Sequence, residues 1–305
     1  MTEFRDPRQT FGACVSALAE ANPDIVILSA DSGKSSGFKP FAAAHPDRYF
    51  ECGIMEQGVV GIAAGLATTG KIPVFCAIAP FTTARPYEMV RNDVGYMRQN
   101  VKIVGRNAGI SYSDLGATHH SLDDFALMRM IPGMTVLAPQ DPTEIEQAAA
   151  AMIEHVGPVY LRIGNEPIPE LGLPGKFTLG KARLIREGTD VTLVSTGNVT
   201  RAALAAAEQL AARGIAAEVL GVPTVWPLDQ AAILDSARKT GRVVTVEEHY
   251  VVGGLGTIVQ ETLSGLPIPV TKLGIPHEYA TSGPYAEILA HYGLDAAGIV
   301  RAVTT

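Results

Sequence analysis

Short runs of β-branched and aliphatic residues alternate with longer alanine-rich stretches along the chain. Continuous apolar runs of this length are typical of strands buried on both faces, whereas the longer stretches between them are candidate helices. Strands are predicted at 24–30, 72–78, 101–105, 135–138, 158–163, 191–195, 217–220, 242–247 and 268–273. Helices are predicted at 57–69, 143–155, 201–213 and 228–239. The alternation predicts an α/β protein with doubly wound parallel sheets.

A segment rich in proline and glycine divides this pattern. Residues 165–180 contain three prolines and three glycines and show no helical period, so we interpret them as an interdomain linker. The chain is therefore predicted to form two α/β domains, a larger one at 1–175 and a smaller one at 180–305. Asp141 stands directly before Pro142 and is the predicted N-cap of the helix that follows.

Composition excludes several classes of protein. The 305 residues include 24 Lys+Arg and 31 Asp+Glu, a net charge of −7, which argues against a nucleic-acid binder. Three cysteines without a CxxC spacing are too few for a disulfide scaffold or a four-thiolate cluster. Residues 1–9 are charged and lack the apolar core of a signal peptide, and no apolar stretch reaches roughly 18–20 residues. We therefore expect a protein of the reducing cytoplasm.

Four polar segments follow predicted strands of the first domain. They contain Asp31 and Ser35, Glu56, Phe81, and the pair His119–His120. The carboxyl ends of parallel strands meet at one edge of a sheet, so the segments are predicted to form one site. Simpler interpretations exist for each: a strand-to-helix turn at 29–37, a first-turn acid at Glu56, and a core aromatic at Phe81.

The fourth segment also admits a metal site. His119 and His120 are followed by Asp123 and Asp124. Adjacent side chains point in different directions, and no third cluster has ligand spacing, so we predict no metal ligands in this chain. A histidine that exchanges protons with a substrate is the more economical interpretation. In the second domain, residues 247–249 end a predicted strand, and we assign them to packing rather than to chemistry.

Many sequence blocks in a fixed order resemble the pyrimidine-binding half of transketolase and its C-terminal domain. The blocks are SAD, PDRYFECGIMEQG, PVFCAIAPF, RND, GATHHSLDDFALMRMIPGMTVLAPQDPTE, PVYLRIG, VTLVSTG, WPLD and VVTVEEHYVVGGLG. The resemblance covers nearly the whole chain. It implies a thiamine-diphosphate enzyme whose two domains are the pyrimidine-binding domain and the transketolase C-terminal domain.

The resemblance also implies a role for individual residues. Glu56 would be catalytic, hydrogen-bonding a nitrogen of the cofactor's pyrimidine ring, and Phe81 would stack on that ring. Asp31 would lie near the thiazolium and the substrate. His119 would be the second catalytic residue, contacting the carbonyl and hydroxyl of the donor, and Ser35 matches a phosphate-contacting serine.

Other substrate positions depart from the family pattern. Leu115, next to Asp114, stands where the family has an aspartate that binds a sugar hydroxyl. Asn107 replaces a phosphate-contacting histidine, and Asn165 stands near the place of a phosphate-binding arginine. These changes indicate an atypical substrate, unless another cation supplies the missing charge. The candidates for that cation are Lys34, Arg106 and Arg162.

A second departure concerns the diphosphate. Enzymes of this class hold diphosphate and Mg²⁺ with a GDG motif, and this chain contains no GDG. The resemblance therefore implies the smaller subunit of a split transketolase, paired with a GDG-bearing subunit as an α₂β₂ heterotetramer. The Mg²⁺ would be ligated mainly by that partner subunit.

The expected reaction is transfer of a two-carbon ketol unit from a ketose to an aldehyde. The alternatives are a decarboxylating acyloin synthase, a 2-oxoacid dehydrogenase β subunit, or a non-catalytic partner. Retention of Glu56, Phe81 and His119 argues against the last.

Overall fold

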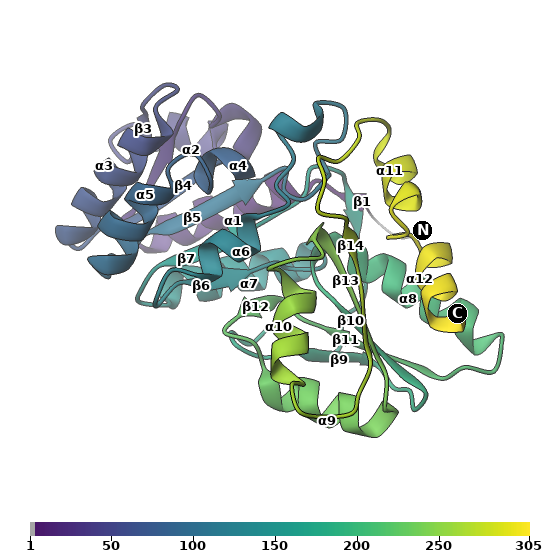
Figure 1. The fold of residues 1–305 in the computed structure, drawn as a ribbon. Coiled ribbons are helices and arrows are strands. Elements are labelled where there is room, and N and C mark those ends of the chain that lie inside the picture. The colour runs from purple at the N-terminus through teal and green to yellow at the C-terminus, as the bar shows by residue number, and fades with distance from the viewer. Residues whose placement is uncertain (1–3) are drawn as a thin grey trace.

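The computed structural model describes residues 4–305, which form two lobes, each built on a twisted sheet. In Figure 1 the N-terminal half of the chain, purple to blue, forms one lobe, and the green and yellow C-terminal half forms the other. Within residues 4–305, no helix has both the length and the apolar character needed to cross a membrane.

The first sheet has seven strands in the order β12-β6-β7-β5-β4-β2-β3. Its strands are β2 (Ile25–Ser29), β3 (Tyr49–Glu51), β4 (Ile72–Ile78), β5 (Lys102–Arg106), β6 (Thr135–Leu137), β7 (Val159–Arg162) and β12 (Thr224–Trp226). All neighbours are parallel except β12, which pairs antiparallel with β6. This edge strand comes from the C-terminal half of the chain, so the two halves share a sheet.

The second sheet has five strands in the order β14-β13-β10-β11-β9. Its strands are β9 (Arg183–Arg186), β10 (Val191–Ser195), β11 (Ala217–Gly221), β13 (Val243–Tyr250) and β14 (Val270–Ile275). It is parallel apart from β9, which lies antiparallel to β11. A separate two-stranded pair joins β1 (Phe4–Arg5) to β8 (Ile168–Pro169). The segment 165–180 contains no other strand or helix.

Helices cover the sheets. They are α1 (Pro7–Ala21), α2 (Lys39–Ala44), α3 (Glu56–Thr68), α4 (Ala79–Thr82), α5 (Tyr87–Met89), α6 (Asp124–Arg129), α7 (Pro142–Glu154), α8 (Thr200–Ala211), α9 (Gln230–Thr240), α10 (Leu255–Thr262), α11 (Tyr285–His291) and α12 (Ala296–Thr304). The Asp141 carboxylate accepts a hydrogen bond from the Glu144 N–H at 2.7 Å, which confirms the predicted cap of α7.

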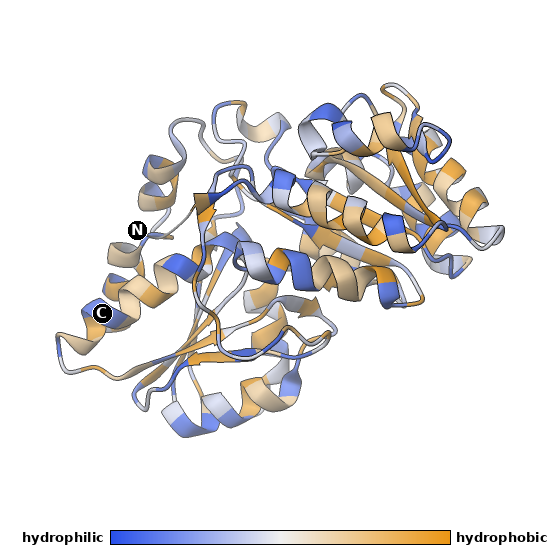
Figure 2. Ribbon diagram, turned by 180° about the vertical axis from the view of Figure 1, so that it is seen from behind, coloured by the Kyte–Doolittle hydropathy of each residue, from blue (hydrophilic) through white to orange (hydrophobic). Residues whose placement is uncertain are grey.

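Both faces of the first sheet are buried. Along β4, Phe75 belongs to an apolar cluster that includes Val59 of α3, whereas Val74 belongs to a second cluster with residues of α1 and α7. Figure 2 shows the strands mostly orange, with blue residues gathered on helices and loops. The first cluster continues into the other lobe through Val194 and Leu255. The predicted α/β fold with two mainly parallel sheets is confirmed, and the antiparallel edge strands are additions to it.

Candidate active site

The loops that carry the candidate residues lie side by side because their strands do. β7, β5, β4 and β2 are consecutive neighbours in the first sheet and run parallel. The loops after them therefore emerge at one edge, and α3 begins beside them, after β3. This is the place where open α/β sheets bind ligands.

A cavity of about 310 Å³ opens at this edge. It is lined by Ala30, Asp31, Ser32, Ile54, Glu56, Ala77, Ile78, Phe81, Arg85 and Arg106. Glu56, the first residue of α3, is 3% exposed, and Phe81 comes from the short helix α4 after β4. The structure thus brings Asp31, Glu56 and Phe81 together in one cavity, although they are 25 to 50 positions apart in the sequence.

Arg85 occupies the space between two of these residues. Its Nη1 donates a hydrogen bond to Glu56 Oε1 at 2.6 Å, and its guanidinium carbon lies 3.9 Å from the centre of the Phe81 ring. A ring that stacked on Phe81 and hydrogen-bonded Glu56 would use the groups that Arg85 now contacts. Arg85 was not identified from the sequence; the available signal was its position only four residues after Phe81.

Asp31 has a left-handed backbone, with φ of +54°. Its N–H donates to Glu51 Oε1 at 2.7 Å, and the Gly53 N–H donates to the same oxygen at 3.2 Å. Burial acts to raise the pKa of Glu51, but hydrogen bonds from these N–H groups and from neighbouring hydroxyls outweigh it, so the pKa is lowered. An ionised Glu51 therefore fixes the turn that presents the exposed Asp31 side chain.

His119 lies beside two aromatic side chains, Phe81 of the cavity lining and Tyr112. Its ring lies edge-on to Phe81 and Tyr112, with ring centres 5.3 Å and 5.6 Å away. His120 is buried, with no hydrogen-bond partner for either ring nitrogen among residues 4–305, and burial lowers its pKa. Asp124 instead contacts Arg162. These histidine and aspartate side chains therefore diverge, and the described chain contains no group of three or more potential metal ligands.

None of the six predicted substrate residues, Ser35, Asn107, Asp114, Leu115, His119 and Asn165, is part of the cavity lining, and three of them are exposed. Ser35 is exposed, and its Oγ donates to the Ser32 carbonyl at 3.0 Å. Asp114 and Leu115 are exposed on the loop between β5 and α6. The structure therefore does not bring these three side chains to Glu56.

Asn107 and Asn165, which stand where the family pattern has a basic residue, each accept a hydrogen bond from an arginine. Arg106 Nη1 donates to Asn107 Oδ1 at 3.1 Å, and Arg8 Nη1 donates to Asn165 Oδ1 at 2.6 Å. Arg8, which also pairs with Asp6, was missed in the sequence because it lies at the start of α1, far from the recognised motifs. Positive charge is therefore present beside both positions where the family pattern has a basic residue.

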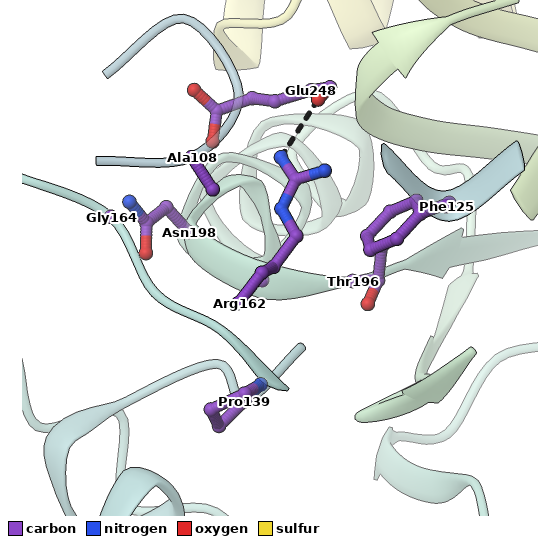
Figure 3. A pocket seen from close by; sticks show the side chains of 9 residues that line it. Ala108, Phe125, Pro139, Arg162, Gly164, Thr196, Asn198 and Glu248 are labelled. Carbon is purple, nitrogen blue, oxygen red and sulfur yellow. Dashed lines mark hydrogen bonds between the residues drawn. The ribbon is translucent and has the colours of Figure 1, made fainter. Parts of the chain in front are cut away.

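The Arg162 side chain is buried between the two lobes and contacts residues of both. It forms an ion pair with Asp124 at 2.9 Å, donates to the Glu248 carbonyl at 2.8 Å and lies 4.3 Å from the centre of the Phe125 ring. Figure 3 shows its guanidinium between Phe125 and Glu248, in a pocket of only about 10 Å³. That space suits a single water molecule, so Arg162 is not available to a substrate.

Residues 247–249 belong to the same buried contact. Glu247 accepts hydrogen bonds from the N–H groups of Leu255 and Gly256 at the start of α10, at 2.6 Å and 2.7 Å. Glu248 accepts from the Tyr285 hydroxyl at 2.8 Å, and His249 stacks on Phe125. Burial raises the pKa of Glu247 to about 7 and lowers the pKa of His249 to about 4.

Comparison with known proteins agrees with this architecture. The transketolase pyrimidine-binding domain matches residues 5–168, and the transketolase C-terminal domain matches residues 180–299. The chain is 42% identical to one subunit of the apulose-4-phosphate transketolase of Phocaeicola vulgatus, over 96% of this chain and 95% of that protein. It is 41% identical to the 6-deoxy-6-sulfo-D-fructose transketolase subunit SqwH of Clostridium sp. strain MSTE9, over 97% and 92%.

One solved structure resembles the whole chain. It is a split-gene transketolase in the form of an inactive β4 tetramer, with a TM-score of 0.91, 42% identity, and coverage of 98% of this chain and 97% of that one. Both domain matches and near-complete relatives thus agree with the order of the sequence blocks and with the two sheets. The chain belongs to the transketolase family and contains its pyrimidine-binding and C-terminal domains.

Proposed function

We propose that this chain is the pyrimidine-binding subunit of a two-chain transketolase that moves a two-carbon ketol unit from a ketose to an aldehyde. The observation that carries the proposal is the cavity in which a buried Glu56 and the Phe81 ring meet at the carboxyl edge of the first sheet. Two relatives that match nearly end to end are subunits of transketolases named for apulose-4-phosphate and for 6-deoxy-6-sulfo-D-fructose.

The cavity fits the aminopyrimidine ring of thiamine diphosphate. A buried carboxylate accepts hydrogen bonds from a ring nitrogen, the Phe81 ring offers a stacking surface, and Ala30, Ala77 and Ile78 supply apolar walls. Arg85 already demonstrates that a flat cationic group can satisfy Glu56 and Phe81 together. When bound, thiamine diphosphate supplies a carbon nucleophile for breaking the bond next to a ketone.

The residues of this chain orient the reactants and handle protons. Glu56 would hydrogen-bond the ring nitrogen through a carboxylate oxygen that is shielded from water. Phe81 fixes the plane of the ring. His119, whose ring lies edge-on to Phe81, is placed to exchange a proton with an oxygen of the donor. Asp31, whose N–H donates to Glu51, is part of the cavity lining and would face the substrate there.

The partner is a GDG-bearing subunit, which would hold the diphosphate and most of the Mg²⁺ ligands. Large apolar side chains are exposed beside the cavity: Ile54 is 74% exposed, Met55 is 44% exposed and Ile62 of α3 is 42% exposed. An apolar surface next to an incomplete site is suited to covering by a second chain. We propose an α₂β₂ assembly in the cytoplasm, where the three cysteines stay unpaired.

Co-expression with the GDG-bearing subunit tests the proposal. The purified complex is assayed with a ketose plus an aldehyde and, separately, with a 2-oxoacid plus an aldehyde. Ketol transfer is expected with the first pair. Release of CO₂ from the second pair without ketol transfer would overturn the assignment in favour of a decarboxylating enzyme. The chain alone is expected not to bind thiamine diphosphate at micromolar concentration, and tight Mg²⁺-dependent binding by it would contradict the shared site.

A further inference from the structure

Three arginines of the described chain are almost completely buried, and only two of them have an acidic partner. Arg162 pairs with Asp124 at 2.9 Å and Arg183 pairs with Glu144 at 2.8 Å. Arg106 is 4% exposed, yet within residues 4–305 no carboxylate oxygen lies within 4 Å of its nitrogens. Burying a charge costs free energy unless a counter-ion compensates it. The burial of Arg106 without an acidic partner therefore requires an explanation.

The contacts of Arg106 satisfy it only in part. Its Nε donates to Ser36 Oγ at 3.0 Å and its Nη1 donates to Asn107 Oδ1 at 3.1 Å. Both acceptors are neutral, and a guanidinium carries five N–H donors. Burial lowers the pKa of Arg106, and the positive charge of Arg8 acts in the same direction. The surroundings therefore offer hydrogen bonds but no negative charge to this cation.

The position of Arg106 is fixed before any ligand arrives. It is the last residue of β5 and pairs with Ile78 of β4. Ser36, which receives its Nε hydrogen bond, is itself held by donation to the Ser32 carbonyl at 2.8 Å. A guanidinium held on a central strand is a preorganised anion ligand, because little entropy is lost when it binds.

Arg106 also lines the cavity that contains Glu56 and Phe81. We propose that Arg106 binds the acidic group of the substrate, a phosphate or a sulfonate, and so selects acidic sugars over neutral ones. The proposal rests on the proposed function in taking this cavity as the reaction site. It gives the substitution at Asn107 a consequence: the anion is bound by Arg106, beside Asn107, instead of by the missing histidine.

Anion binding by the full chain alone is the first test. The thermal midpoint is measured against increasing inorganic phosphate and, in parallel, sulfate, for the wild type, Arg106→Met and the exposed-arginine control Arg213→Met. Wild type and control are expected to gain stability in a saturable way. Arg106→Met should weaken phosphate binding about ten- to hundred-fold, since a charge-assisted contact is lost. An unchanged phosphate response in Arg106→Met would overturn the proposal.

Relief of the buried charge gives a second readout from the same samples. Without phosphate, Arg106→Met is expected to have a thermal midpoint at or above that of the wild type, because an uncompensated cation is replaced by an apolar side chain of similar length. A large loss of stability in Arg106→Met without phosphate would show that the protein itself compensates the charge, which contradicts the argument.

The assembled enzyme separates the substrate's acidic group from the diphosphate of the cofactor. For the complex with the GDG-bearing subunit, kcat/KM is compared for a phosphorylated ketose and its unphosphorylated counterpart, and thiamine diphosphate affinity is measured by calorimetry. Arg106→Met should lose the preference for the phosphorylated ketose and keep the cofactor affinity. A fall in cofactor affinity with the substrate preference intact would assign Arg106 to the diphosphate and overturn the proposal. If the complex transfers no ketol unit at all, the proposed function fails, while the phosphate experiment still decides the anion site.

Discussion

Under the proposed function, Arg85 competes with the cofactor for the two groups that would hold its pyrimidine ring, so replacing Arg85 with alanine is expected to tighten cofactor binding. The guanidinium donates to Glu56 at 2.6 Å and stacks 3.9 Å above the Phe81 ring. Both contacts must be given up when a ring enters between them. In Arg85→Ala this cost is absent, and nothing else that the cofactor contacts is altered.

The size of the effect follows from the two contacts and their exposure. A hydrogen bond between charged groups contributes about 1.5–3 kcal/mol, and a cation over an exposed ring contributes about 0.5–1 kcal/mol. The Arg85 side chain is 37% exposed, so solvent screening reduces the sum, and we take about 1–2 kcal/mol as the net cost of displacing it. Since about 1.4 kcal/mol corresponds to a factor of ten, the dissociation constant should fall roughly 5- to 30-fold.

Calorimetric titration of the two-chain complex with thiamine diphosphate and Mg²⁺ measures this dissociation constant. Arg85→Lys keeps the charge but loses the flat guanidinium, and an intermediate affinity is expected. Arg213→Ala, just after the exposed end of α8, controls for the loss of a positive charge elsewhere. An affinity that is unchanged or weaker in Arg85→Ala would refute the reasoning, because it would mean that Arg85 supports the bound cofactor.

Four other changes have defined outcomes. Glu56→Gln should lower turnover of the complex at least about 100-fold while calorimetry shows cofactor binding within a few-fold of wild type; full turnover would remove Glu56 from catalysis. Arg162→Met leaves the buried Asp124 without its cationic partner and should cost about 3–5 kcal/mol in urea unfolding, and a loss under about 1 kcal/mol would contradict the interdomain role. Burial raises the pKa of Glu247 from 4.5 to about 7, so the folded protein binds this proton more tightly than the unfolded chain does. The resulting contribution to stability is complete below pH 4.5 and is lost as the pH rises through 7. Glu247→Gln should therefore lose less stability between about pH 5 and pH 8 than the wild type, and an unchanged pH profile would refute this assignment. A Cβ on Gly12 would lie 2.7 Å from the Gly37 backbone, so Gly12→Ala should cost about 1–3 kcal/mol, whereas wild-type stability would show that the loop shifts freely.

The central strands of the fold could be predicted because short sequence segments are enough to identify them. Buried parallel strands are continuous apolar runs, and all nine predicted runs overlap a strand of the structure. The strands β9 and β12 were not predicted because each is short and lies at a sheet edge. β12 also owes its strand conformation to β6, a partner almost 90 residues away, and no local pattern encodes such pairing.

Sequence motifs identified some residues of the candidate site but not those whose role depends on the position of a side chain in the folded protein. Glu56, Phe81 and Asp31 were identified from segments that follow strands, and they line one cavity. Arg85 was missed because its importance depends on where its flexible side chain lies. The lack of an acidic partner for Arg106 among residues 4–305 is a fact about three-dimensional surroundings, which no spacing along the chain reveals.

The short strand β12 has a consequence for how this protein can be divided. Thr224–Trp226 forms the outer edge of the first sheet although the chain reaches it only after building part of the second. Proteolysis within 170–180 should leave two fragments that remain associated, since the break would not remove β12 from β6 or separate the common apolar cluster. A fragment ending at residue 175 would instead expose the unpaired edge of β6, a surface prone to aggregation. Recombination between relatives would therefore preserve the protein better by exchanging both halves together than by joining halves at the linker.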